Sequence, residues 1–179
     1  GFHKKLSEVT IMSTWQTEEA KRFRAALIGH GSVIMCIGLI AGIILIFSML
    51  NGVVIWPIID LAVDIPGSTR GWKTTHVGGL QNGMLLIGIA LALPYIPMSY
   101  ASQKFVFFSF VATGWGNTLF YWAGNFSQNR GLSVVGTPYG EGDIYGAIAY
   151  FAGGSVMLFT IAASLVLASG AFRLARNYQ

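Results

Sequence analysis

Four long stretches of this chain contain no aspartate, glutamate, lysine or arginine, and they constrain its fold more than any other feature. They cover residues 25–59, 74–103, 105–129 and 144–172. A helix needs about 20 mostly apolar residues to cross a bilayer, so each stretch is long enough for one span. Unpaired backbone groups at an open sheet edge are too costly in lipid, which favours helices over strands. We therefore predict an all-α integral membrane protein, a bundle of four transmembrane helices.

The composition agrees with a membrane location. Charged residues make up 10% of the chain and hydrophobic residues 54%, whereas about 25% of a soluble domain is charged. We expect one transmembrane domain over residues 17–179. Residues 1–16 form an N-terminal extension, either a short interfacial helix or a disordered terminus.

The basic residues are distributed as expected for a membrane protein of fixed orientation. Eight of the eleven lie before the first apolar stretch, between the second and third, or after the fourth. The positive-inside rule then places both termini in the cytoplasm. This orientation explains the net charge of +4, and no nucleic-acid partner is expected.

Capping and breaking residues set the expected helix ends. Thr17 and Asp143 can each cap a helix, whereas Pro94 and Pro97 end one. We expect the apolar segment 53–59 to pack on the bundle or to lie in the membrane interface. The helices expected from these patterns cover residues 17–50, 74–93, 104–126 and 144–171.

A histidine at membrane depth marks the first candidate site. A histidine is costly in lipid unless it has a partner or a function. On a helix, Gly79 and Gly83 share the face of His76, so that face is flat beside the imidazole. A planar macrocycle such as haem needs a flat backbone of this kind beside its ligand. The alternative is that the small residues serve close helix packing and the histidine bonds a neighbouring helix.

A polar stripe marks the second candidate site. Asn117, Tyr121 and Asn125 are spaced by four residues on an otherwise apolar helix. Such a stripe must face the bundle interior or a subunit interface. It forms either a hydrogen-bonded seam between helices or a wall that faces a substrate, for which Trp115 is a further candidate.

The expected topology brings the two candidate sites to one side of the membrane. His76 lies near the non-cytoplasmic surface, and Asn82 lies about 9 Å deeper at 1.5 Å per residue. Tyr121 is near the end of a helix that leaves on that same side. We therefore expect His76, Asn82 and Tyr121 to line one pocket across the bundle.

These motifs together resemble the styrene oxide isomerases, small membrane enzymes that convert an aryl epoxide to an aldehyde. The resemblance extends over roughly residues 23–172, and its motifs occur in the same order and spacing. The residues that carry it are Gly29-His30-Gly31, Pro66-Gly67-Ser68, Gly71-Trp72, His76, Leu80-Gln81-Asn82-Gly83-Met84, Gly114-Trp115, Asn117, Phe120-Tyr121, Asn125-Phe126-Ser127, Asn129-Arg130-Gly131-Leu132 and Gly142-Asp143-Ile144.

The resemblance implies a homotrimer in a bacterial inner membrane, with one ferric haem b per subunit at the interfaces. It makes His76 the axial ligand of the haem iron, and Asn82 and Tyr121 the residues that handle the substrate. One departure is that Thr113 stands where the family pattern has an acid before Gly-Trp. This departure bears on which epoxide is preferred.

The expected function is isomerisation of styrene oxide to phenylacetaldehyde by a Meinwald rearrangement, in which ferric haem acts as Lewis acid and a hydride shifts to the neighbouring carbon. One alternative is a non-catalytic haem protein that carries electrons or senses a gas, with His30 as a second ligand. Bonding of His30 to a neighbouring helix is the preferred interpretation. Another alternative is a transporter or structural bundle without a cofactor.

Overall fold

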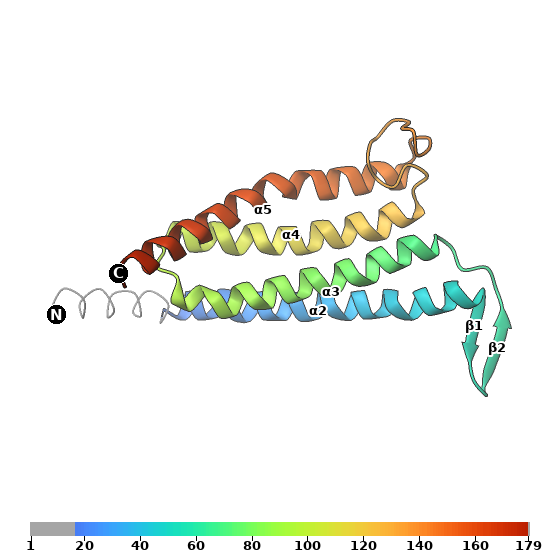
Figure 1. Ribbon diagram of the computed structural model, residues 1–179, viewed down its shortest axis with the longest axis horizontal. Coiled ribbons are helices and arrows are strands. Elements are labelled where there is room, and N and C mark those ends of the chain that lie inside the picture. The colour runs from blue at the N-terminus through green and yellow to red at the C-terminus, as the bar shows by residue number, and fades with distance from the viewer. Residues whose placement is uncertain (1–16, 179) are drawn as a thin grey trace.

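Long helices dominate the computed structural model, which describes residues 17–178 (Figure 1). α2 packs mainly on α3, α5 packs mainly on α4, and contacts between α3 and α4 join the two pairs. The start of α2 and the end of α5 lie at the same end of the molecule. The helices are α2 (Glu18–Leu50), α3 (Thr69–Ala92), α4 (Tyr100–Phe126) and α5 (Ile144–Arg176), with a short 3-10 helix η1 (Leu93–Tyr95) after α3.

Side-chain caps set the starts of these helices. Thr17 accepts a hydrogen bond from the amide of Ala20 at 3.2 Å, and Asp143 caps α5, so both predicted caps are confirmed. α3 begins five residues before the predicted position, because Ser68 caps it through the amide of Gly71 at 2.9 Å. The charged residues there do not stop the helix, because a helix can extend beyond the lipid.

The fold is mostly helical, as predicted for an all-α membrane protein, but a β-hairpin between α2 and α3 corrects the expectation that strands are absent. Strands β1 (Gly52–Ile55) and β2 (Ile59–Ala62) pair antiparallel, and they extend outward from the end of α2 (Figure 1). The segment expected to pack on the bundle is therefore largely exposed, with Trp56 84% accessible. The argument against strands applies only inside the hydrocarbon region of a bilayer. The hairpin begins directly after Asn51, whose left-handed backbone conformation ends α2.

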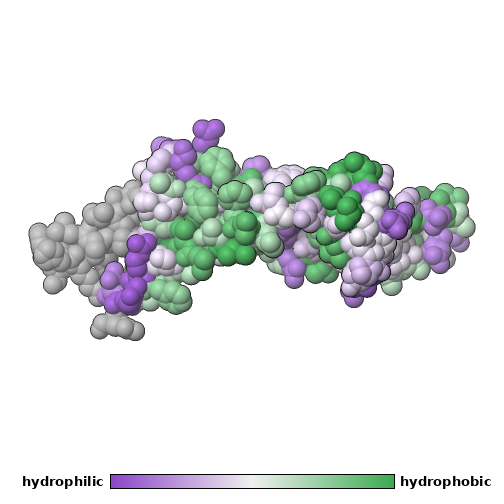
Figure 2. Space-filling model, turned by 90° about the horizontal axis from the view of Figure 1, so that it is seen from above, coloured by the Kyte–Doolittle hydropathy of each residue, from purple (hydrophilic) through white to green (hydrophobic). Residues whose placement is uncertain are grey.

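The surface of the helices suits a membrane. In the described residues, three helical segments are long and apolar enough to span one: α2, Thr69–Tyr95 and α5. α4, which carries the polar stripe, is not among them, although a fourth span was predicted there. Figure 2 shows broad hydrophobic patches, in green, between hydrophilic residues, in purple. The orientation, the closed bundle and the trimer stay predictions.

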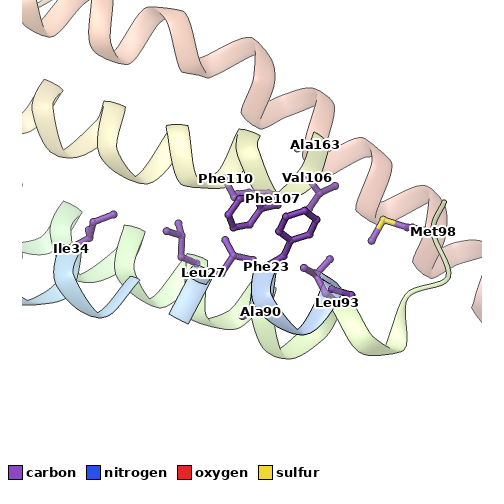
Figure 3. Close-up of a cluster of buried hydrophobic side chains, with 12 residues drawn as sticks. Phe23, Leu27, Ile34, Ala90, Leu93, Met98, Val106, Phe107, Phe110 and Ala163 are labelled. Atoms are coloured by element: carbon purple, nitrogen blue, oxygen red, sulfur yellow. The ribbon is translucent and has the colours of Figure 1, made fainter. Parts of the chain in front are cut away.

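A tightly packed core lies at the end where α2 begins and α5 ends (Figure 3). The rings of Phe23 and Phe107 stack with centroids 4.6 Å apart, and Phe110 is 2% exposed. Leu93 and Met98, beside the α3–α4 connection, complete the cluster. This end is therefore well packed, whereas the cavities described below lie toward the opposite end.

Glycines allow α2 and α3 to pack in close contact. A Cβ added at Gly79 would lie 2.6 Å from the Cα of Gly38, and one added at Gly31 would lie 2.7 Å from the carbonyl oxygen of Gly83. We expect Gly79→Ala to lower the free energy of unfolding by about 1–3 kcal/mol, the usual cost of overpacking.

The measurement is denaturant unfolding of the protein in micelles, with Gly88→Ala as the matched control. Gly88 has no atom within 4 Å of an added Cβ, so its alanine variant gains helix propensity without a clash. Equal unfolding midpoints for the two variants would contradict the packing argument.

Candidate functional site

His76 is held against α2 by a hydrogen bond to a backbone carbonyl. Its Nδ1 lies 2.8 Å from the carbonyl oxygen of Gly38, and a Cβ added at Gly42 would lie 2.6 Å from that nitrogen. A carbonyl oxygen only accepts, so Nδ1 carries a proton, and in the neutral ring the lone pair is on Nε2. Histidines that bind metals are commonly oriented in this way through their other ring nitrogen.

Gly79 and Gly83 do not provide the flat cofactor surface that was expected beside His76. Both are buried against α2, where Gly79 meets Gly38 and Gly83 meets the backbone of Gly31. The alternative prediction of close helix packing is therefore correct for these two glycines. Sequence spacing indicates which residues share a helix face, but it does not indicate which neighbour covers that face.

Asn82 connects α3 to the polar stripe of α4. It is 6% exposed, and its Nδ2 donates to the carbonyl oxygen of Gly78 at 2.7 Å. Its Oδ1 accepts from the Nδ2 of Asn117 at 2.9 Å. The ring of Tyr121 lies over Gly78, where an added Cβ would be 2.7 Å from Cζ. The prediction that the stripe faces the interior is thus confirmed for Asn117 and Tyr121.

Asn125 completes the stripe at the outer end of α4. Its Oδ1 accepts from the amide of Ser68 at 3.0 Å and from the hydroxyl of Ser68 at 3.3 Å. Asn125 therefore fastens the start of α3 to the end of α4. Asn117 and Asn125 form the predicted hydrogen-bonded seam, whereas Tyr121 between them packs on Gly78 and borders cavities.

Three cavities meet at Tyr121. The loop cavity, of about 560 Å³, lies below the α4–α5 connection, and the α4–α5 groove has a volume of about 440 Å³. A third cavity of about 370 Å³ lies along α3. Tyr121 lines all three, and its hydroxyl has no hydrogen-bond partner among residues 17–178. The loop cavity is bordered by Ser68, Arg70, Asn125, Gln128, Arg130 and Tyr139.

His76 and Tyr121 do not line one pocket within a single chain, which corrects the prediction. His76 lines none of the three cavities. At 3.6 residues per turn, His76 and Gly78 point about 200° apart around α3. His76 therefore faces α2, while Gly78 and Asn82 face α4.

Trp115 and His30 form a separate contact between α4 and α2. The indole nitrogen of Trp115 donates to Nδ1 of His30 at 3.2 Å, and the two rings meet edge to face. The prediction that His30 bonds a neighbouring helix is confirmed. Trp115 lines none of the three cavities, so its placement does not match that of a pocket residue.

Comparison with known proteins identifies the family. The family model described as "Styrene oxide isomerase" matches residues 23–172. A curated relative, "Styrene-oxide isomerase" of Pseudomonas fluorescens, is 33% identical over 127 residues, which cover 71% of this chain and 75% of the relative.

The chain belongs to the styrene oxide isomerase family.

Membership of the styrene oxide isomerase family confirms the resemblance that the sequence motifs carry. It makes the chain an isomerase, so the non-catalytic alternatives, an electron carrier, a gas sensor or a transporter, are wrong. The matched region includes most of α2 and α5 and all of α3 and α4. The candidate site residues therefore all lie inside the part of the chain that resembles the family.

Thr113, the position where an acid was expected, forms a pair of hydroxyls with a residue of α5. Thr113 is 2% exposed, and its Oγ1 lies 2.6 Å from Oγ1 of Thr160 on α5. Thr113 also donates to the carbonyl oxygen of Ser109 at 2.7 Å. A neutral hydroxyl pair thus joins α4 and α5 here, and an ionised carboxyl group would be costly at this buried position.

Asn129 organises the connection between α4 and α5, and sequence reasoning did not single out this role. It is fully buried, and its Nδ2 donates to the carbonyl oxygens of Ser133 at 2.7 Å and Val135 at 3.0 Å. The guanidinium of Arg130 stacks over the ring of Tyr139, 4.7 Å from its centroid. The loop is therefore a packed structure that closes the loop cavity from above.

Asp143 fixes the end of this loop, and its ionisation makes the loop sensitive to pH. Its carboxylate accepts from the amides of Gly146 at 2.6 Å and Gln128 at 2.7 Å, and these bonds lower the pKa of Asp143 below its usual 3.8. Since the folded pKa is the lower one, this stabilisation is complete above pH 3.8 and is lost as the pH falls through the folded value.

We expect amides 127–147 to lose hydrogen-exchange protection below about pH 4, after correction for intrinsic rates. Asp143→Asn should remove this pH dependence, because an amide does not ionise in that range. Glu141→Gln, two residues earlier, serves as the control and should leave it intact. Equal pH dependence in wild type and Asp143→Asn would contradict the role of Asp143.

Proposed function

We propose that this chain isomerises aryl epoxides to aldehydes, styrene oxide to phenylacetaldehyde, inside the membrane with a ferric haem b bound by His76. Family membership supports an isomerase of this kind. The observation that carries the proposal is the phenol of Tyr121, which has no partner in the described chain and lines three cavities. A free phenol in a mostly apolar cavity can donate a hydrogen bond to an epoxide oxygen.

The donor groups of the chain suit a haem better than a bare metal ion. Within residues 17–178, no group of three histidine, cysteine or acidic side chains is placed to hold a metal. A haem brings four ring nitrogens of its own and requires one axial ligand from the protein. His76 is the residue that would hold it, because its Nδ1 is bonded to Gly38 and its Nε2 has no hydrogen-bond partner among residues 17–178. When bound, ferric haem supplies a Lewis acid that withdraws electron density from an epoxide oxygen without net redox change.

The reaction requires the breaking of one carbon–oxygen bond and the shift of one hydride. The bond between oxygen and the benzylic carbon breaks, and its electron pair goes to oxygen. A hydride then moves from the neighbouring carbon to the benzylic carbon while the carbonyl double bond forms, so all atoms and electrons balance. Tyr121 holds the epoxide oxygen through its phenol, and the apolar cavity walls keep water from trapping the cation as a diol.

Asn82 acts in this proposal by positioning. Its amide joins the backbone of Gly78, the side chain of Asn117 and thereby α4 in one buried network. This network fixes the distance between α3 and α4 beside Tyr121. The oxygen of the substrate is then held in one orientation, so that one hydrogen is aligned for migration.

A homotrimer completes the site in this proposal. His76 and the cavities at Tyr121 lie on different faces of α3, so one chain does not bring them together. In a trimer, a neighbouring subunit places its own Tyr121 beside His76 of the first subunit. The two side chains then lie in one site. Such closed cyclic assemblies use the same two surfaces on every subunit.

The test of the proposed function uses styrene oxide with two deuterium atoms on the terminal carbon and purified, haem-supplied protein. The proposal predicts phenylacetaldehyde that retains both atoms, one of them now on the benzylic carbon, as measured by mass spectrometry. A diol as the main product, or an aldehyde that has lost deuterium from the benzylic carbon under conditions that prevent enolisation, would contradict the hydride shift.

A further inference from the structure

The α4–α5 groove is lined by both apolar and polar side chains. Of its lining residues, Asn117, Tyr121, Tyr150 and Thr160 carry polar side-chain groups, and the others are apolar residues or glycines of α4, α5 and the connecting loop. Its volume of about 440 Å³ falls within the roughly 300–1,000 Å³ typical of small-molecule sites. The apolar walls are formed by Phe120, Leu132, Met157 and Ile161.

Two adjacent glycines in this groove differ in their surroundings. A Cβ added at Gly153 would lie 2.9 Å from the ring of Phe120, so Gly153 is needed for packing. A Cβ added at Gly154 would meet no atom within 4 Å, although Gly154 also lines the groove. A glycine inside a helix is destabilising relative to alanine. Packing within the chain therefore does not explain Gly154, and the space it leaves is part of the groove.

We infer that the α4–α5 groove binds the aromatic ring of the epoxide, and that the missing side chain at Gly154 determines how large a ring is accepted. This inference rests on the proposed function, because it takes an aryl epoxide as the ligand. The ring lies between Phe120 and the aliphatic side chains of α5, and the epoxide oxygen points toward Tyr121. A lipid acyl chain fits the walls equally well but has no oxygen to accept from the phenol of Tyr121, whereas Asn117 and Thr160 are already bonded to Asn82 and Thr113.

The α4–α5 groove also lies beside the lipid-facing surface of α5, from which an apolar substrate arrives. Its α5 wall belongs to a helix whose outer residues are large and exposed, including Phe151 at 65% and Leu158 at 69%. Styrene oxide dissolves readily in the apolar interior of a bilayer, so it reaches α5 from the lipid. From the groove it meets Tyr121 without passing through water.

The first test is kinetic and uses Gly154→Ala, Gly154→Leu and Gly88→Leu. Gly88 is an equally open helix position that lines none of the three cavities. We expect Gly154→Leu to raise KM for styrene oxide at least tenfold and to raise KM for 4-tert-butylstyrene oxide further. Gly154→Ala should raise both KM values by smaller factors, again more for 4-tert-butylstyrene oxide than for styrene oxide. Gly88→Leu should keep both KM values within twofold of wild type. The haem absorbance should be unchanged in all three variants.

The second test does not depend on turnover. The detergent-solubilised wild type is photolabelled with a phenyl trifluoromethyl diazirine, with and without excess ethylbenzene, and the labelled peptides are mapped. We expect ethylbenzene to protect residues 150–161 in the wild type and in Gly88→Leu, and not in Gly154→Leu. If this protection is found in a protein without isomerase activity, the proposed function fails while the aryl site stands.

Two results would overturn the inference. One is a Gly154→Leu variant whose KM values and ethylbenzene protection match those of wild type. The other is a Gly154→Leu variant whose oligomer dissociates on size-exclusion chromatography while Gly88→Leu remains assembled, because Gly154 would then serve a contact between subunits.

Discussion

Replacing His76 with alanine is expected to abolish haem binding and isomerase activity together. In the proposed function the imidazole would hold the haem, and its Nδ1 is already fixed by the carbonyl oxygen of Gly38 at 2.8 Å. Loss of the ring leaves the α2–α3 contact intact, because that contact depends on Gly38 and Gly79. The protein should therefore fold and assemble without the cofactor.

The measurement is the Soret absorbance of the purified, haem-supplied variant, followed by an assay of phenylacetaldehyde formation. We expect no Soret band above that of free haem and no activity above background. His30→Ala serves as the control and should keep both, because His30 accepts its hydrogen bond from Trp115. A coloured and active His76→Ala protein would remove His76 as the ligand.

Replacing Tyr121 with phenylalanine is expected to leave the haem in place and to lower kcat by about 10²–10³, the usual cost of losing one donor to a developing oxyanion. The hydroxyl has no partner in the described chain, so its removal breaks no internal hydrogen bond. The ring stays packed over Gly78. The loss should appear in kcat more than in KM, because the hydrogen bond strengthens as charge develops on oxygen.

Steady-state kinetics of Tyr121→Phe, with haem content measured on the same sample, test this expectation. Tyr145→Phe is a suitable control, because Tyr145 is half-exposed on α5 and lines none of the three cavities. Asn82→Ala is a less decisive variant, since it leaves Asn117 without its partner and so affects folding as well. Unchanged turnover in Tyr121→Phe would exclude the phenol from the mechanism.

Local patterns in the sequence were sufficient to predict several features of the fold. Uncharged stretches of sufficient length became helices, because an apolar backbone in lipid must satisfy its own hydrogen bonds. Thr17 and Asp143 cap the helices that they were predicted to cap. The spacing of Asn117 and Tyr121 placed both on the buried face of α4. The motif series also identified the family, since rare residues in fixed order are independent of the details of packing.

The neighbour that each helix face contacts depends on how the helices pack together, and local patterns did not predict it. His76, Gly79 and Gly83 share a face of α3, and that face packs on α2, so the glycines serve helix contact. Tyr121 packs on Gly78 from the other side, which separates it from His76. The hairpin after Asn51 and the open position at Gly154 were likewise not predicted. Periodicity describes one helix at a time, whereas contacts between residues 38 and 76 or 78 and 121 depend on the packing of the whole chain.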